Sequence, residues 1–339
     1  MRFSTETIRL DLVHPFRIAR EVSAHKNNVL VRISDGEMTG IGEAAPSLYY
    51  GEDAGSVLRA LEEVSALPGG DPFGLEATMD RLVTRIPGDS AARAAVDIAL
   101  HDLAAQRLGV PLYRWLGLDP GETPVTSFTI GIDEPKAIRR KVREAAGYPA
   151  LKVKLGSEPE KDLEIMRAIR SETDARIRID ANAGWTADQA VEMVKRLSEF
   201  DVELVEQPLP PGSPEAWRRV REAASMPIIA DESVLTSRDV PAMAGLVDGV
   251  NVKLMKCGGV REALRLIHTA RAHGMIVMIG CMIESSVAIT AAAHLSPLAD
   301  YADLDGNLLI SNDPFSGASV RQGHLVLPEK PGIGVAPRS

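Results

Sequence analysis

The chain has 339 residues, of which 45% are hydrophobic and 25% are charged, and its formal net charge is −9. This acidic balance, without a basic cluster, argues against a nucleic-acid partner. The N-terminus lacks the apolar core of a signal peptide, and no apolar run is long enough to cross a bilayer, so we expect a cytoplasmic protein without membrane contact. Cys257 and Cys281 cannot build a disulfide framework and fit a reducing compartment.

The first third of the chain reads as strands followed by helices. Alternation of apolar and polar residues predicts a three-stranded antiparallel sheet over residues 3–13, 28–34 and 37–43, with a turn at Ser34-Asp35-Gly36. Helices are predicted over 54–67, stopped by Pro68-Gly69-Gly70, over 75–85, and over 90–108 with Ser90 as N-cap and Gly109 just past the end. This order indicates a separate α+β capping domain, to which we assign residues 1–119.

From Val125 the pattern changes to strict alternation of strands and helices. Eight short apolar runs follow one another up to residue 305, and successive runs end 22 to 27 residues apart, at Lys154, Asp180, Glu206, Asp231, Lys253, Gly280 and Asp303. A (β/α)8 barrel spends roughly 30 residues on each unit and builds its active site at the C-terminal ends of the strands. Helix starts lie between the runs, as a capping box at Thr186 and Gln189 and as Ser213-Pro214. We therefore expect a modified (β/α)8, TIM-like barrel over 120–306, with residues 307–339 returning to the capping domain.

Three of the strand ends carry carboxylates in consecutive units: Asp180, Glu206 and Asp231. Neighbouring strands lie about 4.8 Å apart, so the three side chains can converge, and they would repel one another strongly without a cation among them. Oxygen ligands without His or Cys favour a hard divalent ion, and a site completed by water and substrate favours Mg²⁺ over Ca²⁺. A single such carboxylate could merely cap a helix, but three in a row predict one bound Mg²⁺.

Lysines end two strands on opposite sides of the predicted barrel. Lys152 and Lys154 project to the same side of their strand, and Lys253 ends a strand half a barrel away from Lys154. A metal-held substrate would then have an amine on each face, which suits removal of a proton next to a carboxylate, through an enediolate, and its return on the other face. The sequence therefore predicts racemisation or epimerisation by Lys154 and Lys253, with Lys152 beside them. Lys256 competes with Lys253 for this role, although a surface position is an equal alternative.

Five motifs surround this predicted site: Lys152-x-Lys154, Asp180-Ala181-Asn182, Val205-Glu206-Gln207-Pro208, Ala230-Asp231-Glu232-Ser233 and Lys253. Together with the helix over 94–103, they resemble the muconate lactonizing enzyme subgroup of the enolase superfamily over essentially the whole chain. The superfamily as a whole pairs a Lys or His base with Mg²⁺. The resemblance implies supporting roles for Asn182 and Glu232. The His–Asp dyad of the mandelate racemase subgroup has no counterpart, because His268, His273 and His294 fall in predicted helices.

The eighth strand narrows the resemblance further. Asp303-Leu304-Asp305 resembles the Asp-x-Asp motif of dipeptide epimerases, in which the pair binds the N-terminal ammonium of the substrate, and residues 251–259 and 280–284 resemble the same enzymes. The resemblance implies a dipeptide substrate, Mg²⁺ as cofactor, and substrate contacts from Thr129, Met282 and Ile283. Bacterial members with L-Ala-D/L-Glu activity recycle cell-wall peptides, whereas other members prefer cationic or hydrophobic dipeptides. A capping role is the plain alternative for the two aspartates.

Two loops of the capping domain, over 14–26 and 48–54, correspond to the segments that set specificity in the superfamily. Arg20 lies near the arginine of glutamate-specific members, although the local spacing differs. Glu52-Asp53 would suit a cationic side chain, and Tyr49-Tyr50 an apolar one. The preferred side chain of the C-terminal residue therefore stays open.

Other functions remain as alternatives. Within the subgroup these are N-succinylamino acid racemase, o-succinylbenzoate synthase and muconate cycloisomerase, whose substrates carry no free ammonium and leave Asp303 and Asp305 unexplained. A Schiff-base barrel aldolase or another lyase would leave the three carboxylates without a task, and a non-catalytic binding protein is a third class. The physiological pathway and the oligomeric state stay open, with a homo-oligomer among the options.

Overall fold

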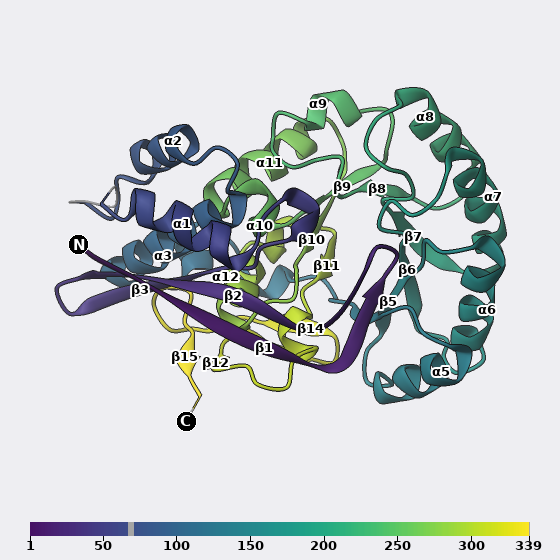
Figure 1. Cartoon of the computed structure of the whole chain (residues 1–339), viewed down its shortest axis with the longest axis horizontal. Helices are drawn as coiled ribbons and strands as arrows, with labels where there is room; N and C mark the ends of the chain where they lie inside the picture. The colour runs from purple at the N-terminus through teal and green to yellow at the C-terminus, as the bar shows by residue number, and fades with distance from the viewer. Residues whose placement is uncertain (67–70, 339) are drawn as a thin grey trace.

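The computed structural model describes residues 1–66 and 71–338. The chain begins with a three-stranded antiparallel sheet (Figure 1). Its strands, in the order β1-β2-β3, are β1 (Arg2–Ile18), β2 (Glu21–Asp35) and β3 (Met38–Ala44). The predicted sheet is thus confirmed, but its first two strands form a longer hairpin whose register shifts between Asp11 and Phe16. Residues 21–27 are exposed or half-buried, so they lack the alternation of buried apolar and exposed polar residues from which the longer strand could have been predicted.

Helices follow the sheet: α1 (Ala54–Val64), α2 (Leu75–Arg85), α3 (Ser90–Leu108) and α4 (Leu112–Trp115), with single 3-10 turns η1 (Leu48–Tyr50) and η2 (Pro120–Glu122). The bounds of α2 and α3 are those predicted. α1 ends at Val64, before the predicted end at Leu67. That end and the predicted stop at 68–70 lie outside the described residues. None of the helices in the described ranges is long and apolar enough to cross a membrane.

The start of α3 differs from the prediction. Asp89, not Ser90, occupies the N-cap position, and its side chain makes no capping hydrogen bond. Instead the Glu52 carboxylate accepts hydrogen bonds from Ser90 Oγ at 3.1 Å and from the Ala91 N–H at 3.2 Å. Asp53 caps α1 by accepting from the Ser56 N–H at 2.7 Å. The suggestion that these two acids receive a cationic substrate is therefore wrong for Glu52, which is buried at a helix N-terminus.

α3 packs directly on the backbone of β3. A Cβ atom on Gly40 would lie 2.0 Å from the Ala99 carbonyl oxygen, and one on Gly42 would lie 1.9 Å from the Ala95 carbonyl oxygen. Only glycine permits this approach, because any side chain would push the helix away. The close packing fixes the sheet against α3, and α3 in turn contacts the barrel helices α10 (Leu254–Cys257) and α11 (Val260–Ala272).

The second part of the chain is a nearly closed barrel of eight parallel strands, as predicted. The strands, hydrogen-bonded in chain order, are β4 (Phe128–Ile130), β5 (Ala150–Lys154), β6 (Arg176–Asp180), β7 (Val202–Glu206), β8 (Ile228–Ala230), β9 (Gly249–Val252), β10 (Ile276–Gly280) and β11 (Tyr301–Asp303). The first and last strands meet through a bridge between Thr126 and Ala302, and the Ser127 N–H donates to the Ala302 oxygen at 3.1 Å. The chemistry-bearing strand ends therefore share one rim.

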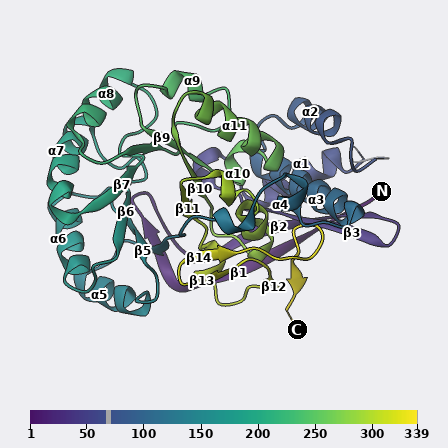
Figure 2. The ribbon, with the colours of Figure 1, turned by 180° about the vertical axis from the view of Figure 1, so that it is seen from behind.

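Helices cover the outside of the barrel, as Figure 2 shows for α5 to α8. They are α5 (Pro135–Glu144), α6 (Pro159–Arg170), α7 (Ala187–Leu197), α8 (Pro214–Ala223), α9 (Val240–Met243), α10, α11 and α12 (Ser286–Ala293), with 3-10 turns η3 (Ser198–Phe200), η4 (Ser296–Leu298) and η5 (Gly306–Leu308). The predicted capping box of Thr186 and Gln189 is present. Ser213 Oγ accepts from the Ala216 N–H, so the predicted N-cap of α8 is also confirmed.

The C-terminal segment contains two small antiparallel pairs. β12 (Phe315–Ser316) pairs with β15 (Ala336–Pro337), and β13 (Ser319–Arg321) pairs with β14 (His324–Val326). The segment touches the helices that follow the sheet, because the Leu112 N–H donates to the Gly332 oxygen at 2.8 Å and the Ile333 N–H donates to Asp102 Oδ1 at 2.8 Å. These bonds tie the end of the chain to α3 and α4.

His294, at the end of α12, connects three parts of the molecule. The Tyr113 N–H donates to His294 Nδ1 at 3.1 Å, and His294 Nε2 lies 3.0 Å from the Ile333 carbonyl oxygen. Since Nδ1 accepts, Nε2 must carry the hydrogen that Ile333 receives, and the ring is neutral. Burial lowers the pKa of this imidazole to about 4. The neutral ring thus belongs to the packing between barrel, helices and C-terminal segment.

Candidate active site

The predicted carboxylate trio comes together at the rim of the barrel. Asp180 and Glu206 are partners in the ladder between β6 and β7, and Asp231 follows β8 directly. Each residue offers one oxygen, and these oxygens lie within 4.8 Å of one another. All three residues are buried. Among the described residues this is the one group of acidic, His or Cys side chains with metal-binding geometry.

The donor set fits a hard divalent cation. Burial, together with the negative charge of Asp180, raises the pKa of the Glu206 carboxyl to about 8, although Lys152 opposes the shift. Such a carboxyl is poorly ionised near neutral pH unless more positive charge enters the site. Carboxylate oxygens are the ligands that Mg²⁺ prefers, so the three residues suit that ion.

One oxygen of each carboxylate is held by a separate donor. The Asn182 N–H donates to Asp180 Oδ1 at 2.8 Å, Asn251 Nδ2 donates to Glu206 Oε1 at 2.8 Å, and Lys256 Nζ donates to Asp231 Oδ1 at 2.5 Å. The other oxygen of each carboxylate faces Lys152, Lys154 or Lys253. Donors of this kind orient the carboxylates for a common ligand. Asn251 was not singled out from the sequence, although it lies two residues before Lys253 and therefore on the same face of the strand.

Lys152 lies among three carboxylates at the centre of the barrel. Its Nζ is 3.0 Å from Asp180 Oδ2, 2.7 Å from Glu206 Oε2 and 2.7 Å from Asp303 Oδ2. Burial would lower the pKa of this ammonium, but the surrounding carboxylates outweigh it and raise the pKa well above its ordinary value. Lys152 is therefore a buried cation that offsets part of the negative charge of these carboxylates.

Lys154 and Lys253 flank the trio from opposite sides. Lys154 Nζ donates to Asp180 Oδ2 at 2.6 Å, and Lys253 Nζ donates to Asp231 Oδ2 at 2.7 Å. Their strands, β5 and β9, lie four places apart in the eight-stranded order. Both side chains line one cavity of about 110 Å³. Burial would lower the pKa of Lys253, but the Asp231 carboxylate outweighs it and raises that pKa.

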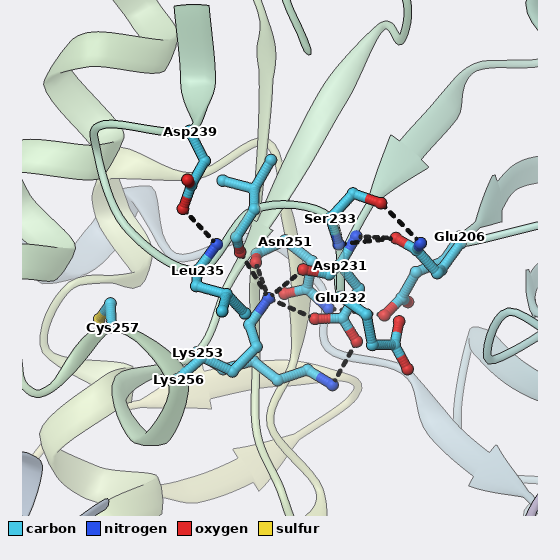
Figure 3. Close-up of polar contacts among 12 residues, drawn as sticks. Glu206, Asp231, Glu232, Ser233, Leu235, Asp239, Asn251, Lys253, Lys256 and Cys257 are labelled. Atoms are coloured by element: carbon cyan, nitrogen blue, oxygen red, sulfur yellow. Dashed lines mark hydrogen bonds and ion pairs between the residues drawn. The ribbon is translucent and has the colours of Figure 1, made fainter. Parts of the chain in front are cut away.

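Lys256 does not point to the surface. Its ammonium is buried and donates to Asp231 Oδ1 at 2.5 Å and to the carbonyl oxygens of Asp231, Asn251 and Val234 at 2.6, 2.9 and 3.1 Å (Figure 3). The alternative of a surface lysine is therefore wrong. Gly258, whose φ is 92°, ends α10 directly after Cys257. With four acceptors around it, Lys256 is a positioning residue for Asp231.

Asp303 and Asp305 lie where β11 meets β4. Ser127 Oγ donates to Asp303 Oδ1 at 2.7 Å, and Lys152 Nζ donates to Asp303 Oδ2 at 2.7 Å. The Thr129 N–H donates to Asp305 Oδ2 at 2.6 Å. Burial and the charge of Asp303 raise the pKa of the Asp305 carboxyl to about 7. Both aspartates line the cavity that contains Lys154 and Lys253, which we call the lysine cavity. A cationic group bound there would favour the ionised carboxylates.

The hairpin residue Arg20 reaches the loops that follow β6 and β8. Its Nη1 donates to the Asn182 oxygen at 2.9 Å, and its Nη2 donates to Glu232 Oε1 at 2.7 Å. The guanidinium carbon lies 4.0 Å from the centre of the Tyr49 ring. The structure thus brings Arg20, Asn182 and Glu232 together, and an anionic substrate group would have to share Arg20 with the buried Glu232.

The remaining predicted substrate residues line the same cavity. Thr129, Met282 and Ile283 form part of its wall, and the hairpin contributes Phe16 and Ile18. Asn28 Nδ2 donates to the Ile283 oxygen at 3.0 Å, which fixes the hairpin to the loop after β10. Barrel and hairpin therefore each supply a part of the wall.

Comparisons with known proteins agree with this architecture. The model of the mandelate racemase / muconate lactonizing enzyme N-terminal domain matches residues 4–117, and the model described as enolase C-terminal domain-like matches residues 136–339. An L-Ala-D/L-Glu epimerase of Bacteroides thetaiotaomicron is 44% identical over 337 residues, covering 99% of this chain and 88% of the relative. An L-Ala-D/L-amino acid epimerase of Pedosphaera parvula is 40% identical over 340 residues, covering 96% of each. A crystal structure of a dipeptide epimerase from Enterococcus faecalis, complexed with Mg and the dipeptide L-Leu-L-Tyr, superposes with a TM-score of 0.94 at 34% identity and covers 99% of both chains.

Proposed function

Because the chain belongs to the mandelate racemase / muconate lactonizing enzyme family of the enolase superfamily, we propose that it is a Mg²⁺-dependent dipeptide epimerase. It is an isomerase of the epimerase and racemase type, as its named relatives are. The observation that carries the proposal is the placement of Lys154 and Lys253 on opposite sides of one carboxylate trio and in one cavity. Removal of a proton from one face of a carbon centre and its return on the other face can be carried out directly by a proton carrier on each face.

In the proposed reaction the carboxylates and the lysines of the site have separate roles. Asp180, Glu206 and Asp231 would hold the cation, which when bound supplies positive charge against the negative charge that develops on the substrate carboxylate. Lys154 removes the α-proton of the C-terminal residue from one face, and Lys253 returns a proton on the other. The roles exchange for the opposite epimer. Lys152 remains protonated between the two faces.

The amine end of the substrate would lie at Asp303 and Asp305. An ammonium group there gains charge-assisted hydrogen bonds and adds positive charge beside two buried carboxylates, of which Asp303 already pairs with Lys152. The substrates of N-succinylamino acid racemases and o-succinylbenzoate synthases carry no free ammonium, so they would bring no cation to Asp305, whose hydrogen bond comes from the neutral Thr129 N–H. The pair therefore favours a dipeptide over those alternatives.

The direct test is hydrogen exchange at the α-carbon. Dipeptides of varied C-terminal residue are incubated with enzyme and Mg²⁺ in D₂O, and mass spectrometry detects gain of one deuterium, with chiral chromatography to measure the second epimer. We expect exchange and epimerisation in the native enzyme and neither in a control carrying both Lys154→Met and Lys253→Met. Absence of exchange with every dipeptide, together with turnover of an N-acylated amino acid, would reject the proposal.

A further inference from the structure

A second cavity, of about 210 Å³, lies next to the lysine cavity. Its wall is largely apolar and includes Leu12, Val13, Phe16, Ile130, Leu308 and Leu309. Phe16, Thr129 and Leu309 line both cavities, so these shared residues form the boundary between them. Nothing in the reaction described above uses this second space.

The side chains of Lys141, His14 and Glu144 in the wall of the second cavity already have partners. Lys141 Nζ lies 3.0 Å from Asp133 Oδ2, and His14 Nε2 lies 2.8 Å from Glu144 Oε2. The remaining surface favours an apolar group over a charged one. A smaller apolar cavity of about 150 Å³ in another protein is able to hold a benzene molecule, so this space is large enough for a branched or aromatic side chain.

The position of the cavity relates it to one end of the substrate. The Thr129 N–H donates to Asp305, and Thr129 also lines the second cavity, so the cavity begins beside the proposed ammonium site. In a dipeptide, the ammonium and the side chain of the N-terminal residue leave the same carbon atom. The C-terminal α-carbon, by contrast, must lie between Lys154 and Lys253. Of the two side chains, the N-terminal one therefore lies nearer the second cavity.

We propose that this second cavity binds the side chain of the N-terminal residue and makes the enzyme selective for a branched or aromatic apolar residue at that position. The inference rests on the proposed dipeptide epimerase function. It concerns the N-terminal residue and the second cavity, whereas the hairpin residues Ile18 and Arg20 line only the lysine cavity.

The test compares two substrates that differ only at the N-terminus. L-Ala-L-Z and L-Phe-L-Z share the C-terminal residue Z that exchanges fastest with N-terminal alanine. Burial of the larger apolar side chain should raise kcat/KM for the phenylalanine dipeptide about tenfold or more. A ratio of one or below in the native enzyme would overturn the inference.

Variants that fill the cavity provide the second arm. Val13→Trp and Leu308→Trp each add an indole to the wall, and we expect each to lower the Phe/Ala ratio about tenfold. Val13 is 55% exposed, and its backbone bond to Leu309 is kept in any variant, so the fold should tolerate the change. Val83→Trp, on an exposed face of α2, is the matched control and should leave the ratio unchanged.

The outcomes separate this inference from the function on which it rests. If L-Ala-L-Z exchanges its α-hydrogen but both filling variants keep the native ratio, the cavity does not bind the N-terminal side chain while the epimerase function stands. If neither dipeptide exchanges, the proposed function itself has failed, and the cavity assignment falls with it.

Discussion

Replacement of Lys256 by methionine tests whether this lysine positions Asp231 or carries the proton in place of Lys253. The change keeps the length of the side chain but removes an ammonium that donates to Asp231 Oδ1 and to three carbonyl oxygens. Asp231 keeps Lys253 in this variant, but Asp231 Oδ1 and the three carbonyl oxygens lose their common donor, and breaking a buried ion pair of this kind destabilises proteins by about 3–5 kcal/mol. Folded proteins are stable by only about 5–15 kcal/mol in total. We therefore expect Lys256→Met to lower the free energy of unfolding by about 3–5 kcal/mol and to weaken binding of Mg²⁺.

The matched variant, Lys253→Met, should behave differently. Lys253 Nζ donates to Asp231 Oδ2, and Asp231 keeps its bonds to Lys256 in that variant. Loss of one charge-assisted hydrogen bond should cost about 1.5 kcal/mol. Turnover should nevertheless be lost, because one face of the substrate has no proton carrier. Solvent exchange of a single epimer should survive through Lys154.

Urea denaturation, Mg²⁺ titration by calorimetry and α-hydrogen exchange in D₂O measure these quantities on both variants. The reasoning is refuted if Lys256→Met retains native stability and Mg²⁺ affinity yet loses turnover, while Lys253→Met turns over normally. Lys256 would then be the base on that face. An equal loss of stability in both variants would also contradict the division of roles.

Three further predictions concern the cofactor, the substrate and pH. Chelation of divalent cations should abolish turnover, and Mg²⁺ or Mn²⁺ should restore it; full activity of metal-free enzyme would remove the metal from the reaction. Free dipeptides should react more than tenfold faster than their N-acetyl forms, because acetylation removes about 1.5–3 kcal/mol of binding at the ammonium site. The double variant Asp303→Asn, Asp305→Asn should reduce this ratio of rates. Equal turnover of both forms by the native enzyme would favour an N-succinylamino acid racemase. The pKa of His294 falls from 6.5 to about 4 on folding, so the unfolded chain binds more protons than the folded one between these pH values. The contribution of His294 to the free energy of unfolding is therefore complete above pH 6.5 and is lost as the pH drops toward 4, by up to about 3 kcal/mol. Urea denaturation at pH 7 and 4.5 should show a smaller loss in His294→Gln, and equal losses in both proteins would contradict this origin.

The barrel and the residues at its rim were predictable because they follow from local rules. Strand spacing fixes where each strand ends, and side-chain alternation fixes which residues face inward. Asp180 and Glu206 therefore fall into register on adjacent strands, as the sequence indicated. The same rule places Lys152 and Lys154 on one face of β5, and both contact Asp180.

The direction of the Lys256 side chain could not be predicted from local rules. Its position after β9 gave no direction, because α10 turns the chain immediately beyond the strand. The direction of its side chain follows from the carbonyl oxygens of Asp231 and Val234, which belong to the preceding barrel unit. A buried ammonium needs all of these acceptors at once. Their convergence is a tertiary property that spacing alone does not contain.

The walls around the substrate depend on tertiary structure even more strongly. The second cavity joins residues 12–16 of the hairpin, 128–131 of the first barrel strand and its loop, and 308–309 beyond the last strand. Phe16, which lines both cavities, follows the register shift of the hairpin and belongs to a segment separate from the strands that carry the metal-binding carboxylates and the lysines. Catalytic residues can therefore persist while the cavity walls vary. Relatives of similar fold bear names that differ in the amino acids of the dipeptide, as expected if the cavity walls vary while the residues at the barrel rim persist.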